Sequence, residues 1–439
     1  MSRTRFAAAL TAGLLAAACS SSPPPPDGQV GANPNLPSAT QYLVPPMKIT
    51  TPVGFKANET PTVPAGFRIV AVARDLRGPR NILPLANGDI LAVEAGGPGG
   101  EPVTRPKDLI YGIVKGKAHS PVKPGNRIVL LRDTTGDGVA DQRAVLIDKL
   151  NSPFGIAQVG GNLYVAETDK IVRYAFTPGQ AKITGPGTIL TELPGGPIDH
   201  HWTKSLTASP DGTKLYVGIG SNSNIVERGI GVEYERARIW EVDIATGAHR
   251  PYATGLRNPN GLTFQPGTNT LWTVVNERDE IGNNLVPDYM TSVKPGGFYG
   301  WPWSWYGQRV DIRVMPRNPA MVAKAIAPDY ALGPHVAALG LAFNAGGAFP
   351  AHYAGGAFVG EHGSWDRDVP NGYEVAFVPF ANGKPAGKAE TFVGGFLDKD
   401  KHTRGRPVGV AFDAKGDLLI ADDVGNAVWR VTAVKRAAA

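Results

Sequence analysis

This sequence contains very little cysteine, few charged side chains and no long hydrophobic run in its main body. Cys19 is the one cysteine among 439 residues, so no disulfide can form within the chain. Beyond the amino-terminal segment no run of about 18 or more apolar residues occurs, which excludes a membrane-spanning helix there. Charged residues make up 19% of the chain, and the formal net charge of +6 is not gathered into a basic run with interleaved aromatics. We therefore expect no nucleic-acid partner.

Residues 1–18 predict a signal peptide. Arg3 and Arg5 provide a positive start, and the apolar stretch that follows is short and ends in small residues. A segment of this kind directs a protein out of the cytoplasm. We expect the protein to reside in the periplasm or elsewhere in the cell envelope.

Cys19 directly follows three alanines and predicts a lipoprotein-type cleavage site, with lipid on the cysteine. Leu15 lies one place farther from the cysteine than that pattern requires, and an ordinary signal peptide with an incidental cysteine is the alternative. Residues 19–45 are rich in Ser and Pro, which favours an extended tether. The expected membrane contact is through the lipid anchor.

Glycine and proline, by contrast, are abundant, with 55 and 39 residues, and they bound many short β-rich runs. A unit recurs six times: a Pro-x-Gly-aliphatic turn, a short apolar strand, a polar turn and a second apolar strand. The clearest copies start at Pro153, Pro259 and Pro407, and looser copies cover 79–93, 206–217 and 339–359. Six units in order predict an all-β fold, a six-bladed β-propeller over residues 46–439, rather than a large β-sandwich. The longest interval, between the fourth and fifth copies, holds inserted loops rich in Pro, Trp and Tyr.

The densest ionisable cluster is Asp199, His200 and His201, directly before a predicted strand. Adjacent residues on a strand point to opposite faces, so we expect one of the two histidines to reach a given site. Histidine is suited to proton transfer near neutral pH. Two other interpretations stay open: histidines bonded to backbone in a loop, and a metal pair with Asp199.

Arginines lie where two of the repeats begin. Arg257 and Asn258 precede one repeat, and Arg404 and Arg406 precede another. In a propeller such positions meet at one end of the central channel, where converging guanidiniums can bind a polycarboxylate. Arg404 and Arg406 are spaced to share one face of a strand. Surface ion pairs are the alternative.

Two acidic segments raise the question of a metal. Residues 276–280 follow a predicted strand, and oxygen-rich loops suit Ca²⁺, although most such loops are simply solvated. Residues 133–144 resemble the start of a calcium loop, but the twelfth position is Ala144, where the pattern requires glutamate. Strand-like runs flank this second segment, which predicts a hairpin turn rather than a metal site.

At these residues the sequence resembles the glucose/sorbosone dehydrogenase family, most closely its sorbosone-dehydrogenase branch. The likeness extends from about residue 64 onward. It is most specific in GLRNPNGL at 255–262, VNERDEI at 275–281, GGFYGWP at 296–302, GEHGSW at 360–365 and RGRPVG at 404–409. The resemblance implies a six-bladed propeller that uses pyrroloquinoline quinone (PQQ) and Ca²⁺ to oxidise an aldose or a sorbosone-like sugar. It also implies an electron acceptor, which the sequence does not identify.

The resemblance assigns roles to the candidate residues. His201 matches the catalytic base by its spacing to a following Pro-Asp turn. Arg257 and Asn258 match the pair at the quinone, and Arg404 and Arg406 match its Arg-x-Arg pair. The family holds its calcium largely through backbone carbonyls at the position of Glu277 and Arg278.

Two departures from the family pattern bear on activity. Glucose-oxidising members place an aspartate where this chain has Ser221, so the group that orients the base must differ. Glu277 and Arg278 replace a Gly-Pro pair, which backbone coordination tolerates but which weakens the case for glucose as substrate. Two other functions remain open: a calcium-dependent lactonase or esterase, which would need a calcium ringed by Asn, Asp and Glu without arginines, and a non-enzymatic binding propeller tethered to the surface.

Overall fold

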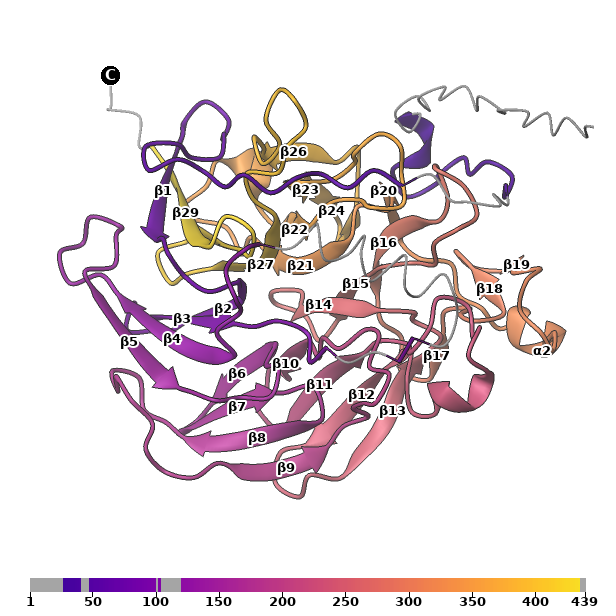
Figure 1. Cartoon of the computed structure of the whole chain (residues 1–439), viewed down its shortest axis with the longest axis horizontal. Helices are drawn as coiled ribbons and strands as arrows, with labels where there is room; N and C mark the ends of the chain where they lie inside the picture. The colour runs from indigo at the N-terminus through magenta and orange to yellow at the C-terminus, as the bar shows by residue number, and fades with distance from the viewer. Residues whose placement is uncertain (1–26, 41–46, 100–101, 104–119, 435–439) are drawn as a thin grey trace, which may run out of the picture.

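The computed structural model describes residues 27–40, 47–99, 102–103 and 120–434, and these form a six-bladed β-propeller (Figure 1). Each blade is an antiparallel sheet of four strands arranged around a central axis. No helix in the described part of the chain is long and apolar enough to cross a membrane. The predicted all-β fold is confirmed.

Blades one to three follow one another along the chain, each running outward from its innermost strand. Blade one contains β2 (Pro79–Pro84), β3 (Ile90–Glu94), β4 (Arg127–Arg132) and β5 (Gln142–Ile147). Blade two contains β6 (Gly155–Val159), β7 (Asn162–Ala166), β8 (Lys170–Ala175) and β9 (Thr188–Glu192). Blade three contains β10 (Leu206–Ala208), β11 (Lys214–Ile219), β12 (Arg238–Asp243) and β13 (His249–Thr254).

Blades four to six complete the ring. Blade four contains β14 (Pro259–Phe264), β15 (Leu271–Val275), β16 (Pro287–Ser292) and β20 (Tyr330–Pro334). Blade five contains β21 (Ala338–Phe343), β22 (Ala357–Glu361), β23 (Glu374–Val378) and β26 (Glu390–Val393). Blade six contains β27 (Pro407–Phe412), β28 (Leu418–Asp422), β29 (Ala427–Ala433) and β1 (Phe67–Ala73).

Several short elements decorate the propeller. β17 (Gly297–Phe298) adds to β13 in parallel, and two hairpins are β18 (Ser304–Trp305) with β19 (Arg309–Val310) and β24 (Phe380–Ala381) with β25 (Lys384–Pro385). The helices are α2 (Pro319–Val322), η1 (Asp27–Gln29), η2 (Ile230–Glu233) and η3 (Ala351–Tyr353). β17, β18, β19 and α2 lie in the long interval noted in the sequence, and Figure 1 shows β18, β19 and α2 at one edge of the ring.

The ring closes by pairing the two ends of the propeller domain. β1 is the outermost strand of the last blade and pairs antiparallel with β29, with Phe67 opposite Ala433 (Figure 1). Closure by complementary strands leaves no blade with a missing outer strand. The sequence repeat did not predict this pairing, because β1 belongs to no copy of it.

The six repeat units are the two inner strands of the six blades, as expected. The glycine of the Pro-x-Gly turn has a packing reason. A Cβ on Gly261 would collide with the backbone of Gly340 and Leu341 in the next inner strand, and a Cβ on Gly155 would collide with residues leading into β10. Inner strands therefore approach one another backbone to backbone, and glycine allows this contact. The turn at 133–141 joins β4 and β5, which confirms the hairpin.

The amino-terminal part of the described chain packs on the propeller. Gly31 bridges Ala331, Val30 and Leu36 pack against core clusters, and Thr62 pairs with Gly394. Residues 27–40 fall within the predicted tether, so this part of it lies against the folded body. The predicted signal peptide and Cys19 lie outside the described residues.

One end of the ring gathers the candidate residues. Because each inner strand is antiparallel to its neighbour, the start of the inner strand and the end of the second strand meet at the same end, as Pro259 and Val275 do. We call this end the site face. The loops that precede the inner strands and follow the second strands all open onto it.

Candidate active site

His201 is held by one backbone carbonyl. It lies in the loop before β10, and its Nδ1 is 2.8 Å from the carbonyl oxygen and 3.0 Å from the hydroxyl of Ser221, which is buried just after β11. A carbonyl can only accept, so Nδ1 carries the proton and the basic lone pair lies on Nε2. Ser221 thus takes the place of the orienting carboxylate that the family pattern led us to look for.

The expectation that His200 and His201 lie on a strand is wrong. Both lie in an irregular loop, in which Asp199 has a positive φ of 39°. Strand alternation therefore does not separate the two rings. They pack edge to face instead, with their centroids 4.6 Å apart.

Asp199 belongs to a buried ion-pair network rather than to a metal site with the histidines. Its carboxylate lies 2.6 Å from Arg236 and 3.4 Å from Lys204. Arg236 also donates to the carbonyl of Gly220, which directly follows β11 and borders His201. Complete burial lowers the pKa of Lys204 to about 8. The network fixes the shape of the loop that carries His201.

Asn258 lies close to His201, and the carbonyl of Arg257 accepts a hydrogen bond from the Ser221 amide. Asn258 and His201 both border Gly220, because a Cβ placed on this glycine would collide with each of them. Arg257 is buried and donates 2.6 Å to the carbonyl of Glu277 and 3.0 Å to the carboxylate of Asp279. The amide oxygen of Asn258 is buried and accepts no hydrogen bond from any described residue.

Glu277 and Arg278 follow β15 with both side chains buried. The amide of Glu277 donates to Asp288, while its Oε1 is buried without a partner among the described residues. Burial, reinforced by Asp288, raises the pKa of Glu277 to about 7. Arg278 turns away from Arg257, and its Nε lies 3.0 Å from Asp311. Glu277 thus contacts two other candidate residues, because its carbonyl accepts from Arg257 and its Oε2 accepts from the Arg278 amide at 3.0 Å.

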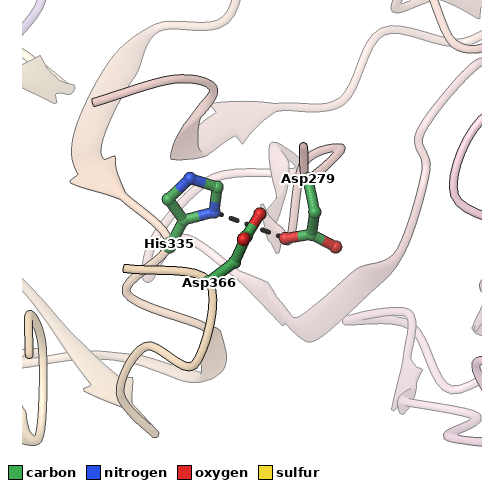
Figure 2. Close-up of side chains that lie close together, drawn as sticks. All are labelled: Asp279, His335 and Asp366. Atoms are coloured by element: carbon green, nitrogen blue, oxygen red, sulfur yellow. Dashed lines mark ion pairs between the residues drawn. The ribbon is translucent and has the colours of Figure 1, made fainter. Parts of the chain in front are cut away.

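A second group of side chains adjoins Arg257 through the ion pair of Arg257 with Asp279. Figure 2 shows its three members, Asp279, His335 and Asp366. Nδ1 of His335 is 3.3 Å from Asp279, and Asp366 lies within 4.8 Å of both, so each of the three offers one potential metal ligand. Burial opposes both shifts, yet Arg257 and His335 hold the pKa of Asp279 at about 2, and Asp279 and Asp366 raise the pKa of His335 to about 9. At neutral pH an imidazolium thus lies close to two carboxylates. Sequence reasoning missed His335 and Asp366, which come from the next blade.

Arg404 and Arg406 lie in the loop before β27, not on a shared strand face, so that expectation is wrong. Arg406 is buried, lies 4.8 Å over the ring of Tyr373, and makes long contacts of 3.4 to 3.5 Å with His362. Its Nε is buried without a partner in the described chain. Arg404 is half-buried, and its guanidinium forms no ion pair or hydrogen bond with any described residue.

Three further residues complete this side of the site face, and the sequence analysis did not name them. His362 Nε2 is 3.0 Å from the carboxylate of Asp423, and Arg80 lies 2.7 Å from the same carboxylate. Arg80 also lies 5.5 Å over the ring of Trp202, the residue after His201. Arg80 and Asp423 therefore link the surroundings of His201, through Trp202, to those of Arg406, through His362. His362 stands in the GEHGSW segment and Arg80 in the first repeat copy, which were the available signals.

Comparison with protein families gives two matches. Residues 123–296 and 317–434 match the family described as TrAA12-like. Residues 242–363 match the glucose/sorbosone dehydrogenase family. This matched segment contains Arg257, Asn258, Glu277 and Arg278. A curated relative from Borreliella burgdorferi, described only as an uncharacterized protein, is 30% identical over 294 residues, covering 64% of this chain and 76% of that protein.

Solved structures share the fold at low sequence identity. The pyranose dehydrogenase PQQ domain from Coprinopsis cinerea, in its holo form, is 19% identical, with 88% of this chain and 100% of that chain covered and a TM-score of 0.67. The carbohydrate-active enzyme family AA12 protein from Trichoderma reesei is 20% identical, with 88% and 99% covered and a TM-score of 0.68. The PQQ-bound aldose sugar dehydrogenase from Streptomyces coelicolor is 15% identical, with 84% and 99% covered and a TM-score of 0.53.

Proposed function

Because this chain belongs to the TrAA12-like family, we propose that it is a quinone-dependent oxidoreductase that oxidises a sugar, with PQQ and Ca²⁺ as its cofactors. The observation that carries the proposal is the setting of His201. Its Nδ1 is fixed by Ser221 beside the buried Arg257 and Asn258. A base on the same face as buried guanidiniums suits proton removal from a substrate that lies against an anionic cofactor.

The site face offers cationic donors that fit the carboxylates of PQQ. Arg257 and Arg406 are buried there, and Arg404 has no described partner. The Nε atoms of Arg406 and Arg80 are buried without hydrogen-bond partners in the described chain. Buried donors of this kind are costly unless a ligand satisfies them. Arg257, Arg404 and Arg406 would hold the carboxylates, with Arg80 as an additional donor on the same face.

The oxygen atoms beside Arg257 fit a hard cation. Oε1 of Glu277 and Oδ1 of Asp366 are buried without described partners, and Ca²⁺ prefers carboxylate and carbonyl oxygens. By resemblance, the carbonyls of Glu277 and Arg278 would hold the ion, and the carboxylates of Asp279 and Asp366 would supply negative charge nearby. When bound, PQQ provides the hydride acceptor and Ca²⁺ acts as a Lewis acid.

The residues of the chain itself would accept the substrate proton and orient the substrate and the cofactor. His201 would accept the proton of the substrate hydroxyl at Nε2, since Nδ1 is engaged with Ser221. The buried amide of Asn258 would orient substrate or cofactor next to that base. Asp279 fixes the position of the Arg257 guanidinium through a 3.0 Å ion pair. These are positioning and electrostatic tasks, while the cofactor carries the redox chemistry.

The proposed substrate is an aldose or a sorbosone-like sugar. The match of 242–363 to the glucose/sorbosone dehydrogenase family supports this class, as does the fold shared with pyranose and aldose sugar dehydrogenases. Ser221 in place of an aspartate favours a sugar other than glucose. A calcium-dependent lactonase would require a calcium ring without arginines, and the buried Arg257 and Arg406 argue against that alternative.

Reconstitution tests the proposal. The purified protein is incubated with PQQ and Ca²⁺, quinone binding is followed by absorbance, and aldoses and sorbosone are supplied with a dye acceptor. Sugar-dependent dye reduction that needs both cofactors is the expected result. Tight quinone binding without turnover on any sugar would overturn the substrate class, and no quinone binding would favour a non-enzymatic propeller. Hydrolysis of lactones with Ca²⁺ alone would support the lactonase.

A further inference from the structure

Exposed apolar side chains gather on two loops of the site face. The loop 220–237 and the insert 299–326 together expose five large hydrophobic residues, each 45% to 80% exposed. We call these five the rim surface: Ile230, Tyr234, Val310, Ile312 and Met315. Scattered exposed apolar residues are normal, but a group rimmed by charged residues is typical of a protein-binding surface.

The two loops are packed against one another, which places the five residues on neighbouring loops. Ile225 and Val226 from the first loop share a core cluster with Trp301 and Val314 from the insert. A pocket of about 420 Å³ opens within the insert, lined by Trp303 together with valines and Arg317. A pocket of that kind can receive an apolar side chain of a partner.

Charge on the insert has one sign at the surface. The insert contains four cationic residues, and its one acidic residue is Asp311, which is buried against Arg278. The cations are Arg309, Arg313, Arg317 and Lys324. The loop 220–237 adds Glu227, Glu233 and Glu235 beside Arg228 and Arg236, so the excess of positive charge lies on the insert. Met and Arg are enriched in protein interfaces, and a basic insert steers an acidic partner.

The rim surface is connected directly to the candidate active site. Asp311 contacts Arg278 at 3.0 Å, and Arg313 lies 3.3 Å from Glu280. Both partners belong to the segment 276–280, whose members contact Arg257. A protein seated on the rim surface would therefore lie close to the bound quinone.

We propose that the rim surface docks an acidic protein that accepts electrons from this enzyme, an inference that rests on the proposed function. Electrons from sugar oxidation must leave, and a carrier on this surface lies beside the site that produces them. A second copy of the chain would bring the same positive charges together. An anionic lipid surface would attract the rim but cover the face through which the sugar enters.

The test compares two acceptors with the PQQ- and Ca²⁺-loaded enzyme. Initial rates are measured with a small dye, with an acidic cytochrome c and with a basic cytochrome c of similar potential. The variants are Met315→Asp and Arg317→Glu. The matched control is Val145→Asp, which changes an exposed valine on β5 of another blade.

Both rim variants should lower kcat/KM for the acidic cytochrome about tenfold and weaken its salt dependence, with the dye rate unchanged. Val145→Asp should behave as wild type. Equal rates with wild type and rim variants, or a preference for the basic cytochrome, would overturn the proposal. The proposal would also be overturned if the rim variants lost binding to anionic vesicles, or lost a dimer seen by light scattering, while their rate with the cytochrome stayed unchanged. An enzyme that reduces no dye with any sugar refutes the proposed function instead, and cytochrome binding by calorimetry then tests the rim surface alone.

Discussion

The backbone carbonyl of Ser221 lies 2.8 Å from Nδ1 of His201, and the Ser221 hydroxyl donates onward to the carbonyl of Ser223. The described hydrogen bonds of the His201 ring are therefore those to the carbonyl and hydroxyl of Ser221. A neutral carbonyl fixes the tautomer but adds less stabilisation to a developing imidazolium than a carboxylate would.

Replacing Ser221 by alanine should leave most of the activity. The carbonyl that holds Nδ1 remains, and only the 3.0 Å hydroxyl contact is lost. We expect kcat to fall less than about tenfold, because one neutral hydrogen bond contributes about 1 kcal/mol. Steady-state turnover after reconstitution measures the effect. A loss as large as that from removing His201 would show that the hydroxyl orients the base.

His201→Ala should lose about a hundredfold to ten-thousandfold in kcat, which is the usual contribution of a positioned base. Bound PQQ and Ca²⁺ should be retained, as checked by absorbance. His200→Ala is the matched control and should change turnover far less, since its ring contacts His201 but not Ser221 among the contacts described. Equal losses would mean that the pair acts together.

Arg404→Ala gives the cleaner test of quinone binding. Its guanidinium has no described partner, so its removal should not destabilise the fold, whereas Arg406 also stacks on Tyr373. Losing a charge-assisted bond costs about 1.5 to 3 kcal/mol, a weakening of roughly tenfold to a hundredfold in PQQ affinity. Titration of the apoprotein measures it. Unchanged PQQ affinity in Arg404→Ala would remove Arg404 from the cofactor site.

The imidazole of His362 should remain neutral in the folded protein down to acid pH. Burial lowers its pKa to about 4, partly offset by Asp423. Between pH 6.5 and 4 the unfolded chain binds a proton that the folded state does not, so stability falls as pH falls. From pH 7 to pH 5 this group should contribute a loss of up to about 2 kcal/mol. Urea unfolding of wild type and His362→Gln at both pH values measures it, and identical pH dependence would contradict the assignment.

Lipid on Cys19 remains a prediction about the cell rather than the fold. Wild-type protein should fractionate with membranes and incorporate labelled fatty acid, because the cysteine closes a signal-like segment. Cys19→Ala should appear in the soluble envelope fraction. Fully soluble wild-type protein after export would favour the ordinary signal peptide.

The repeat unit predicted much of the fold because its glycine reports a physical constraint, the close approach of inner strands. It also predicted that the starts of the repeats, including the segments with Arg257 and Arg406, would lie at one end of the ring. The sequence did not predict the ion-paired group of Asp279, His335 and Asp366, because His335 and Asp366 come from loops of the neighbouring blade. It also misplaced His200 and His201 on a strand, since the buried Asp199 network, invisible in the sequence, holds that segment as a loop.

The pairing of β1 with β29 has a consequence for the newborn chain. Phe67 is synthesised long before its partner Ala433, and at about 5 to 20 residues per second the wait is roughly 20 to 70 s. For that time β1 is a strand without its sheet, and the last blade cannot form. The other five blades receive all four strands from one continuous stretch of chain. Until synthesis ends, the chain is an open arc with an unpaired edge at its start, the state most exposed to wrong pairing with another chain.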